Sequence, residues 1–281
     1  MKMDQAKLLR MRAVAMCAFA LAACGGGDDD KGGGGASGGT TTGGTSGTSG
    51  TSGTTPPASI VAGKVDAQFV PGTDARYASM GLGTLQGKLD SAKQEADGAY
   101  LTLGAYRTTD AARVGAKSGN AAFAMGSWAG KIVNDTTGIE VTAPNGLAYV
   151  VYNRPQAAAS DGTLKCTPHL TSPRIATGSG ETLTGTATMT ITNGVVAVST
   201  DLKLKQANGN ETPMKIETDF AISVEATKYV GLINTTPRDL EYSISLGAGS
   251  NDNHIVVVPW KLNAASGAQC GTAVLDCKRP A

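Results

Sequence analysis

The sequence is poor in the side chains on which most catalytic and binding sites depend. It has two histidines, His169 and His254, and neither has a second His or Cys at metal-ligand spacing, so the sequence predicts no metal site and no cofactor. The formal net charge of +1, without a run of basic residues, excludes the electrostatic footprint of nucleic-acid binding. Aromatic residues make up 5% of the chain, too few for the two aromatic girdles of a transmembrane β-barrel.

Residues 1–23 have the composition of a secretory signal. The basic residues come first: Lys2, Lys7, Arg10 and Arg12. An apolar stretch follows from Ala13 to Leu21, shorter than the roughly 20 residues that span a bilayer. The run Leu21-Ala22-Ala23-Cys24 resembles the lipobox of bacterial lipoproteins at every position. The resemblance implies cleavage before Cys24, a diacylglyceryl group on its sulfur and a membrane anchor, to which each buried methylene contributes about 0.8 kcal/mol.

Gly25 follows the cysteine where an Asp would resemble an inner-membrane retention signal, which favours the bacterial outer membrane. The alternative is an ordinary cleaved signal in which Cys24 has no role. Removal of residues 1–23 takes away four basic residues and one acid and leaves a net charge of about −2.

Residues 24–58 are dominated by Gly, Ser and Thr, and this composition predicts a disordered tether because nothing in it can bury apolar area. Such a chain spans about 30 Å on average. The acidic cluster Asp28-Asp29-Asp30 is a solvated spacer or, alternatively, a sorting signal. Pro56-Pro57 marks the boundary of the globular domain, which the composition places at residues 59–281.

The clearest structural pattern in this domain is a hairpin around Asn193-Gly194, the strongest two-residue signal for a type I′ turn. The turn pairs Thr192 with Val195, and residues 186–192 and 195–205 then separate into two faces. The apolar face holds Ala187, Met189, Ile191, Val196, Val198, Leu202 and Leu204. The polar face holds Thr186, Thr188, Thr190, Thr192, Ser199, Asp201, Lys203 and Lys205.

Alternation continues over residues 214–225 and 239–246, and the apolar run 255–258 predicts a final, central strand covered on both faces. Pro259 predicts a strand end or bulge. Further strands are expected at 100–107, 121–133 and 147–152, and one helix at 85–96, where Leu85, Leu89, Ala92 and Ala96 share a face. The expected fold is all-β, an antiparallel meander of eight to ten strands forming a β-sandwich or a small closed barrel.

Three cysteines remain in the domain once Cys17 is cleaved away and Cys24 is lipidated. An exported protein can form one disulfide among Cys166, Cys270 and Cys277. The local Cys270–Cys277 pair is the favoured prediction, and pairing of Cys166 with either of them remains open.

Other candidate chemistry is sparse. The spacing of Cys166 and His169 matches no known pairing of a nucleophile with a base. The segment Asn251-Asp252-Asn253-His254 lacks the glycine and the distal glutamate of an EF-hand calcium loop, so we predict a polar turn there. Trp128 and Trp260 are predicted to be core residues rather than a ligand platform.

Two functional classes remain. The first is a non-enzymatic, lipid-anchored envelope protein that binds a protein or glycan through its β-rich domain. The second is an envelope hydrolase or assembly factor on a β scaffold. Residues 121–130, with the meander, resemble strands of barrel-bearing surface lipoproteins that bind transferrin or complement factors. This likeness covers few positions and carries over no binding residue.

Overall fold

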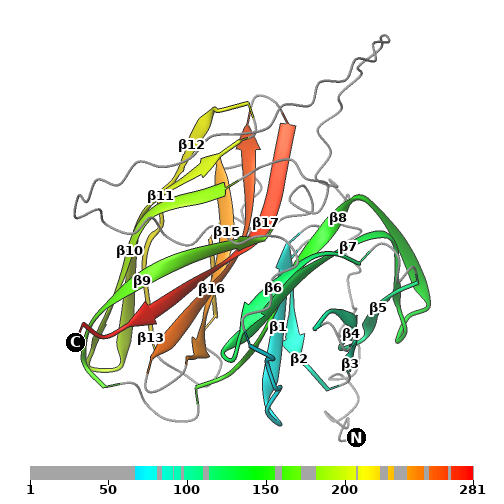
Figure 1. Cartoon of the computed structure of the whole chain (residues 1–281), viewed down its shortest axis with the longest axis horizontal. Coiled ribbons are helices and arrows are strands. Elements are labelled where there is room, and N and C mark those ends of the chain that lie inside the picture. The colour runs from blue at the N-terminus through cyan, green and yellow to red at the C-terminus, as the bar shows by residue number, and fades with distance from the viewer. Residues whose placement is uncertain are drawn as a thin grey trace, which may run out of the picture.

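The computed structural model describes residues 67–80, 84–90, 92–95, 98–109, 114–155, 160–171, 182–206, 208–221, 227–230, 239–249, 253–264 and 267–280. Figure 1 shows two curled antiparallel sheets lying side by side, and the all-β fold predicted from the sequence is confirmed in this two-sheet form. The described ranges contain no helix long and apolar enough to cross a membrane. The predicted signal, Cys24 and the tether lie outside these ranges.

The amino-terminal sheet has eight strands in the order β2-β1-β8-β7-β5-β4-β3, with β6 paired to β7 beside β5. Their bounds are β1 Ala75–Met80, β2 Thr84–Lys88, β3 Ala92–Gln94, β4 Tyr100–Leu103, β5 Tyr106–Thr108, β6 Val114–Asn120, β7 Phe123–Asn134 and β8 Ile139–Asn153. The expected strands at 121–133 and 147–152 correspond to β7 and to part of β8. The expected strand at 100–107 is instead a tight hairpin, β4–β5.

The carboxy-terminal sheet has nine strands in the order β12-β11-β10-β9-β17-β16-β15-β14, with β13 also paired to β11. Their bounds are β9 Gly162–Thr171, β10 Thr182–Thr192, β11 Val195–Lys205, β12 Glu211–Met214, β13 Glu217–Ala221, β14 Thr227–Val230, β15 Leu240–Ala248, β16 His254–Ala264 and β17 Gly267–Lys278. The sheet therefore consists of two meanders joined by the long-range pairing of β9 with β17.

The β10–β11 hairpin has the predicted register. Thr192 pairs with Val195, and Asn193 and Gly194 both have positive φ, 50° and 75°, as a type I′ turn requires. Burial alternates along β11 at every residue. The apolar residues named above are all buried, so the separation of faces predicted from the sequence is confirmed.

Two apolar clusters fill the insides of the two sheets, and a third lies between the sheets. β16 takes part in two of them, because Val256 and Val258 face the inside of the carboxy-terminal sheet while Ile255 and Val257 face the other sheet. The prediction that this strand is covered on both faces is confirmed. The cluster between the sheets consists of Ala78, Ala122, Phe123, Met125, Val150, Tyr152, Ile255, Val257 and Val274.

Polar contacts complete the packing between the sheets. Tyr152 Oη lies 2.8 Å from Ser245 Oγ, and Gln86 Nε2 donates to Ser243 Oγ at 2.8 Å. Each of these pairs joins one sheet to the other. Because polar and apolar contacts both connect the two sheets, we expect them to unfold together.

Tyr100 lies in the apolar cluster inside the amino-terminal sheet, where side chains from two other strands hold it. Its backbone N–H donates to Tyr149 Oη at 3.0 Å, and its carbonyl accepts from Trp128 Nε1 at 2.6 Å. The three rings pack together, and none is measurably exposed. These contacts fasten the short strand β4 onto the long strands β7 and β8.

Burial of two phenols predicts a loss of stability at high pH. Burial, followed by the charges of Tyr106 and Asp90, raises the pKa of Tyr77 to about 12, and burial raises the pKa of Tyr100 further. The folded chain keeps both protons above pH 10, where the unfolded chain loses them, so stability is complete below pH 10 and falls between pH 10 and 12. The expected slope is about 1.4 kcal/mol per pH unit for each phenol.

Chemical denaturation across this pH range measures the slope, and Tyr100→Phe is the matched variant. Among the described residues Tyr100 Oη has no hydrogen-bond partner, so the variant should keep full stability at pH 7 and lose half of the alkaline slope. An unchanged slope in Tyr100→Phe would contradict the assignment.

The helix predicted at 85–96 is wrong. The described part of this segment forms β2 and β3, with Ser79 pairing to Leu85 and Tyr77 to Gly87. Glycine costs about 1 kcal/mol inside a helix. In the strand it leaves room for Tyr77, whose hydroxyl oxygen would lie 3.0 Å from a Cβ on Gly87. The 3.6-residue pattern of apolar side chains is thus overridden by pairing with β1.

Three further expectations need correction. Pro259 does not end its strand, since β16 continues to Ala264. The run 255–258 is not in the final strand, because β17 follows β16 in the chain. The described residues alone form seventeen strands rather than eight to ten. The alternation over 214–225 is split into β12 and β13, because Thr200 Oγ1 accepts from Ile216 N and donates to the Met214 carbonyl at the break. Residues 222–225 lie outside the described ranges.

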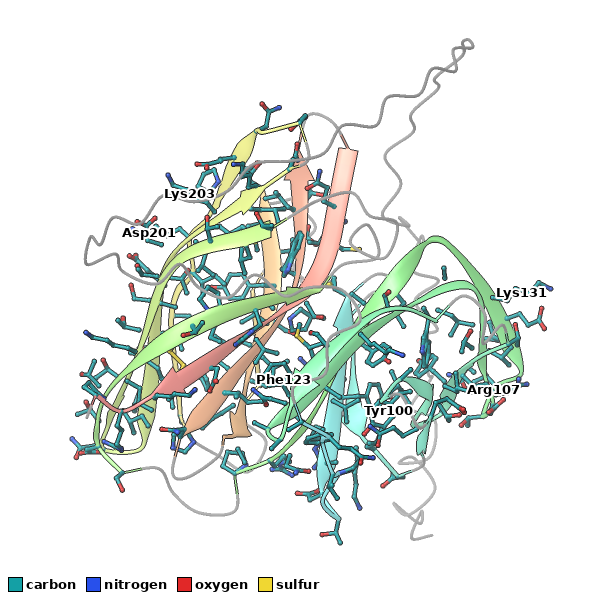
Figure 2. All side chains as sticks on the ribbon, in the orientation of Figure 1. Tyr100, Arg107, Phe123, Lys131, Asp201 and Lys203 are labelled. Carbon is teal, nitrogen blue, oxygen red and sulfur yellow. A yellow bond between two sulfur atoms is a disulfide. The ribbon has the colours of Figure 1, made fainter. Side chains whose placement is uncertain are left out.

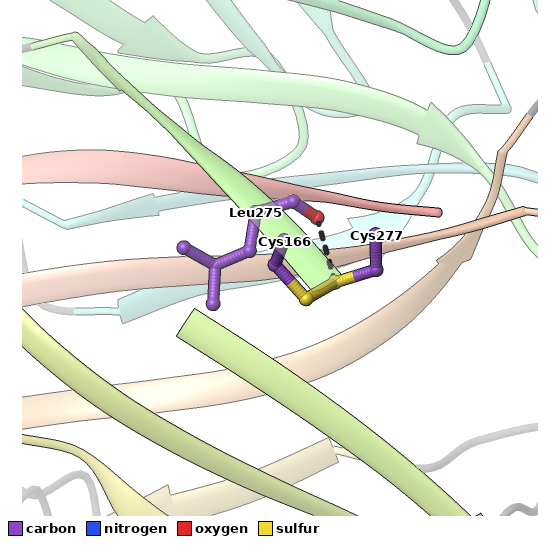
Figure 3. Close-up of a disulfide and its surroundings, with 3 residues drawn as sticks. All are labelled: Cys166, Leu275 and Cys277. Atoms are coloured by element: carbon purple, nitrogen blue, oxygen red, sulfur yellow. Dashed lines mark hydrogen bonds between the residues drawn. A yellow bond between two sulfur atoms is a disulfide. The ribbon is translucent and has the colours of Figure 1, made fainter. Parts of the chain in front are cut away.

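The disulfide joins Cys166 to Cys277, two residues directly opposed on β9 and β17 (Figure 3). The favoured local pair Cys270–Cys277 is wrong, and the open alternative with Cys166 is what the fold contains. Cys270 and Cys277 both belong to β17, with odd spacing, so their side chains leave opposite faces of the strand. Cys277 enters the core of the carboxy-terminal sheet, whereas Cys270 is buried against Met80.

Candidate binding face

The outer surface of β10, β11 and β13, together with Thr163 and Lys165 near the start of β9, forms a polar face on the opposite side of these strands from the core of the carboxy-terminal sheet. Its residues are set in rows by the register: Lys165, Thr188, Ser199 and Glu217 form one row, and Thr163, Thr190, Ala197 and Asp219 form the next. Figure 2 shows Asp201 and Lys203 on this outer side, while Phe123 lies between the sheets. We call these two rows the threonine face.

A shallow groove of about 500 Å³ runs over β11 in the threonine face. Ala197 and Ser199, with short side chains, form its floor. Thr188 and Thr190 line one wall, and Glu217 and Asp219 line the other. The groove exists because small residues on the central strand are flanked by larger ones on both neighbours.

The groove has one hydroxyl wall and one carboxylate wall. Lys215 Nζ lies 2.8 Å from Glu217 Oε1, and this hydrogen bond and the charge of Glu217 raise the pKa of Lys215. Hydroxyls both donate and accept hydrogen bonds, whereas ionised carboxylates only accept. The groove therefore presents more acceptors than donors and suits a ligand rich in hydrogen-bond donors.

No aromatic side chain points outward from β10, β11 or β13 within their described bounds. The large apolar side chains that are exposed in the described chain, Val70, Ile139 and Val195, are scattered over separate elements. The threonine face therefore lacks the aromatic anchors of a tight protein interface, and its contacts have to be polar.

The two histidines are not brought together. His169 faces the other sheet and its ring contacts Phe123, with centroids 5.5 Å apart. His254 opposes Cys277 and faces the core of the carboxy-terminal sheet. They lie on opposite faces of the same sheet, and Cys166, now in the disulfide, also faces away from His169. The pairing of Cys166 with His169 as nucleophile and base is thereby excluded.

The remaining sequence candidates have structural positions. Trp128 and Trp260 are fully buried, which confirms the prediction that they are core residues. Asn251 and Asp252 lie outside the described residues, and Asn253 closes the β15–β16 connection by accepting from Gly249 N. In the described ranges no three His, Cys, Asp or Glu residues gather as a metal site would require.

The sequence analysis placed Thr188, Thr190 and Ser199 on the polar face of the hairpin but did not find the groove. β13 lies beside β11 in the register that β12 begins, and what the alternation does not predict is that the short side chains of Ala197 and Ser199 leave a hollow between β10 and β13. Neither a protein-family model nor a curated protein matches the chain, so no relative indicates what occupies the groove.

Proposed function

We propose that this chain is a lipid-anchored protein of the bacterial cell envelope. Its β-rich domain at residues 59–281, which we call the head, binds a polar ligand rich in hydrogen-bond donors, a protein or a glycan, in the groove of the threonine face. The groove is the observation that carries the binding part of this proposal. The lipobox resemblance at Leu21–Cys24 supports the anchor, and the outer membrane is the proposed location.

The anchor predicts acylation at a single residue. Cells fed a radioactive or clickable palmitate should label the wild-type protein, and Cys24→Ala should abolish the label and release the protein from the membrane fraction. Cys17→Ala is the matched control, because Cys17 belongs to the cleaved segment, and it should leave labelling unchanged. Equal labelling of the Cys24→Ala protein would refute the anchor.

Filling the groove should abolish ligand binding without affecting the fold. Ala197 is exposed on the groove floor, so Ala197→Trp should change stability by no more than about 0.5 kcal/mol. Binding on glycan arrays, or cross-linking to envelope proteins, should fall at least tenfold. Thr184→Trp, an exposed position of β10 outside the groove, is the control and should bind as the wild type does. Equal binding by Ala197→Trp and the wild type would exclude the groove.

A further inference from the structure

The head has one native disulfide and one additional cysteine that can compete for it. Cys270 and Cys277 are seven residues apart, whereas the native partners Cys166 and Cys277 are 111 apart. Closure of a loop in a flexible chain costs entropy that grows with loop length, so the local pair should meet about 60-fold more often than the native pair in the unfolded chain.

The fold is incompatible with the local pair. In an extended strand the seven-residue separation of Cys270 and Cys277 spans about 23 Å, and the two side chains leave opposite faces. A Cys270–Cys277 bond would therefore prevent β17 from forming. β17 lies between β9 and β16 and supplies residues to two apolar clusters, so the carboxy-terminal sheet cannot close around the wrong disulfide.

We propose that the head reaches its native disulfide by thiol–disulfide exchange and is a substrate of a dithiol isomerase in an oxidising compartment. The cellular part rests on the export proposed above. A disulfide oxidant of the glutathione type first takes two electrons from the Cys270 and Cys277 thiols and is reduced to two thiols.

The exchange then needs no further oxidant. A thiolate of the isomerase attacks Cys277 Sγ, the Cys270–Cys277 bond breaks, and Cys270 leaves as a thiolate that takes a proton from water. The Cys166 thiolate next attacks Cys277 Sγ in the mixed disulfide, forms the native bond and releases the isomerase thiolate. The number of disulfides is unchanged. In the folded head Cys166 and Cys277 are both buried, which protects the native bond from further exchange.

Oxidative refolding of the full chain carrying Cys17→Ala and Cys24→Ala, so that only Cys166, Cys270 and Cys277 can react, tests the proposal. The reduced, denatured protein is refolded in a glutathione buffer with and without protein disulfide isomerase, free thiols are alkylated at intervals, and disulfide-linked peptides are assigned by mass spectrometry. We expect Cys270–Cys277 to form first and to convert slowly to Cys166–Cys277, with the isomerase accelerating the conversion at least fivefold.

Cys270→Ala and Cys270→Ser are the matched variants, the second in case the first does not fold. Either should form Cys166–Cys277 in one phase that the isomerase changes less than twofold. Absence of an early Cys270–Cys277 species in the wild type, or equal acceleration of wild type and variant, would overturn the proposal. Because refolding is done without membranes, its outcome is independent of the palmitate experiment, and failure of the export proposal remains distinguishable.

Discussion

Replacement of both Cys166 and Cys277 by alanine should lower the free energy of unfolding by about 5 kcal/mol, the entropy that a 111-residue loop regains in the unfolded chain. A loss of this size is a large fraction of the 5–15 kcal/mol that typical domains possess. Urea denaturation of the oxidised wild type and the double variant measures the difference directly.

Cys270→Ala is the control for the loss of a buried cysteine side chain. It retains the Cys166–Cys277 bond and should lose only about 1 kcal/mol, the contribution of a small buried side chain. If the double variant and Cys270→Ala lost equal stability, the bond between β9 and β17 would have no stabilising role beyond its packing.

Trp128→Ala should lower stability by about 3–5 kcal/mol, because it empties a fully buried site in the aromatic cluster. It also leaves the Tyr100 carbonyl without the donor that Trp128 Nε1 supplies. Thermal unfolding followed by near-ultraviolet circular dichroism should show a lower melting temperature and loss of the aromatic signal.

Phenylalanine variants separate the hydrogen bond from the packing. Trp128→Phe should lose about 1–3 kcal/mol more than Trp260→Phe, since only the first removes a hydrogen bond to a buried carbonyl. Trp260 is equally buried, but in the described residues its Nε1 has no hydrogen-bond partner. Equal losses in the two variants would show that the bond to Tyr100 contributes nothing.

Local patterns in the sequence predicted the structure well where neighbouring strands pair. The β10–β11 hairpin depends on Asn193-Gly194 and on alternation over adjacent residues, and both are readable without any long-range information. The covered strand at 255–258 was found for the same reason: a consecutive apolar run requires two covered faces.

Long-range pairing was not readable from the sequence. Nothing near Cys277 indicates that β17 pairs with β9, and entropy favours the wrong partner, Cys270, so the disulfide prediction failed. The helix prediction at 85–96 failed for a different reason: Leu85, Leu89 and Ala92 fit a helical period, but pairing with the adjacent strands β1 and β4 decides the conformation of this segment. The groove was missed for another reason: alternation along β10, β11 and β13 predicts which side chains face outward, but not that small residues on β11 leave a hollow between its neighbours.

The central position of β17 sets the order in which this head can be made. β9 and β16 remain edge strands until β17 is available, and exposed edges are sites of aggregation and proteolysis. A chain that leaves a ribosome or a translocation channel amino terminus first therefore carries an incomplete sheet until Gly267–Lys278 has emerged. The head is completed from its carboxy-terminal side, and nascent chains that stop short of β17 are expected to be substrates for chaperones or proteases.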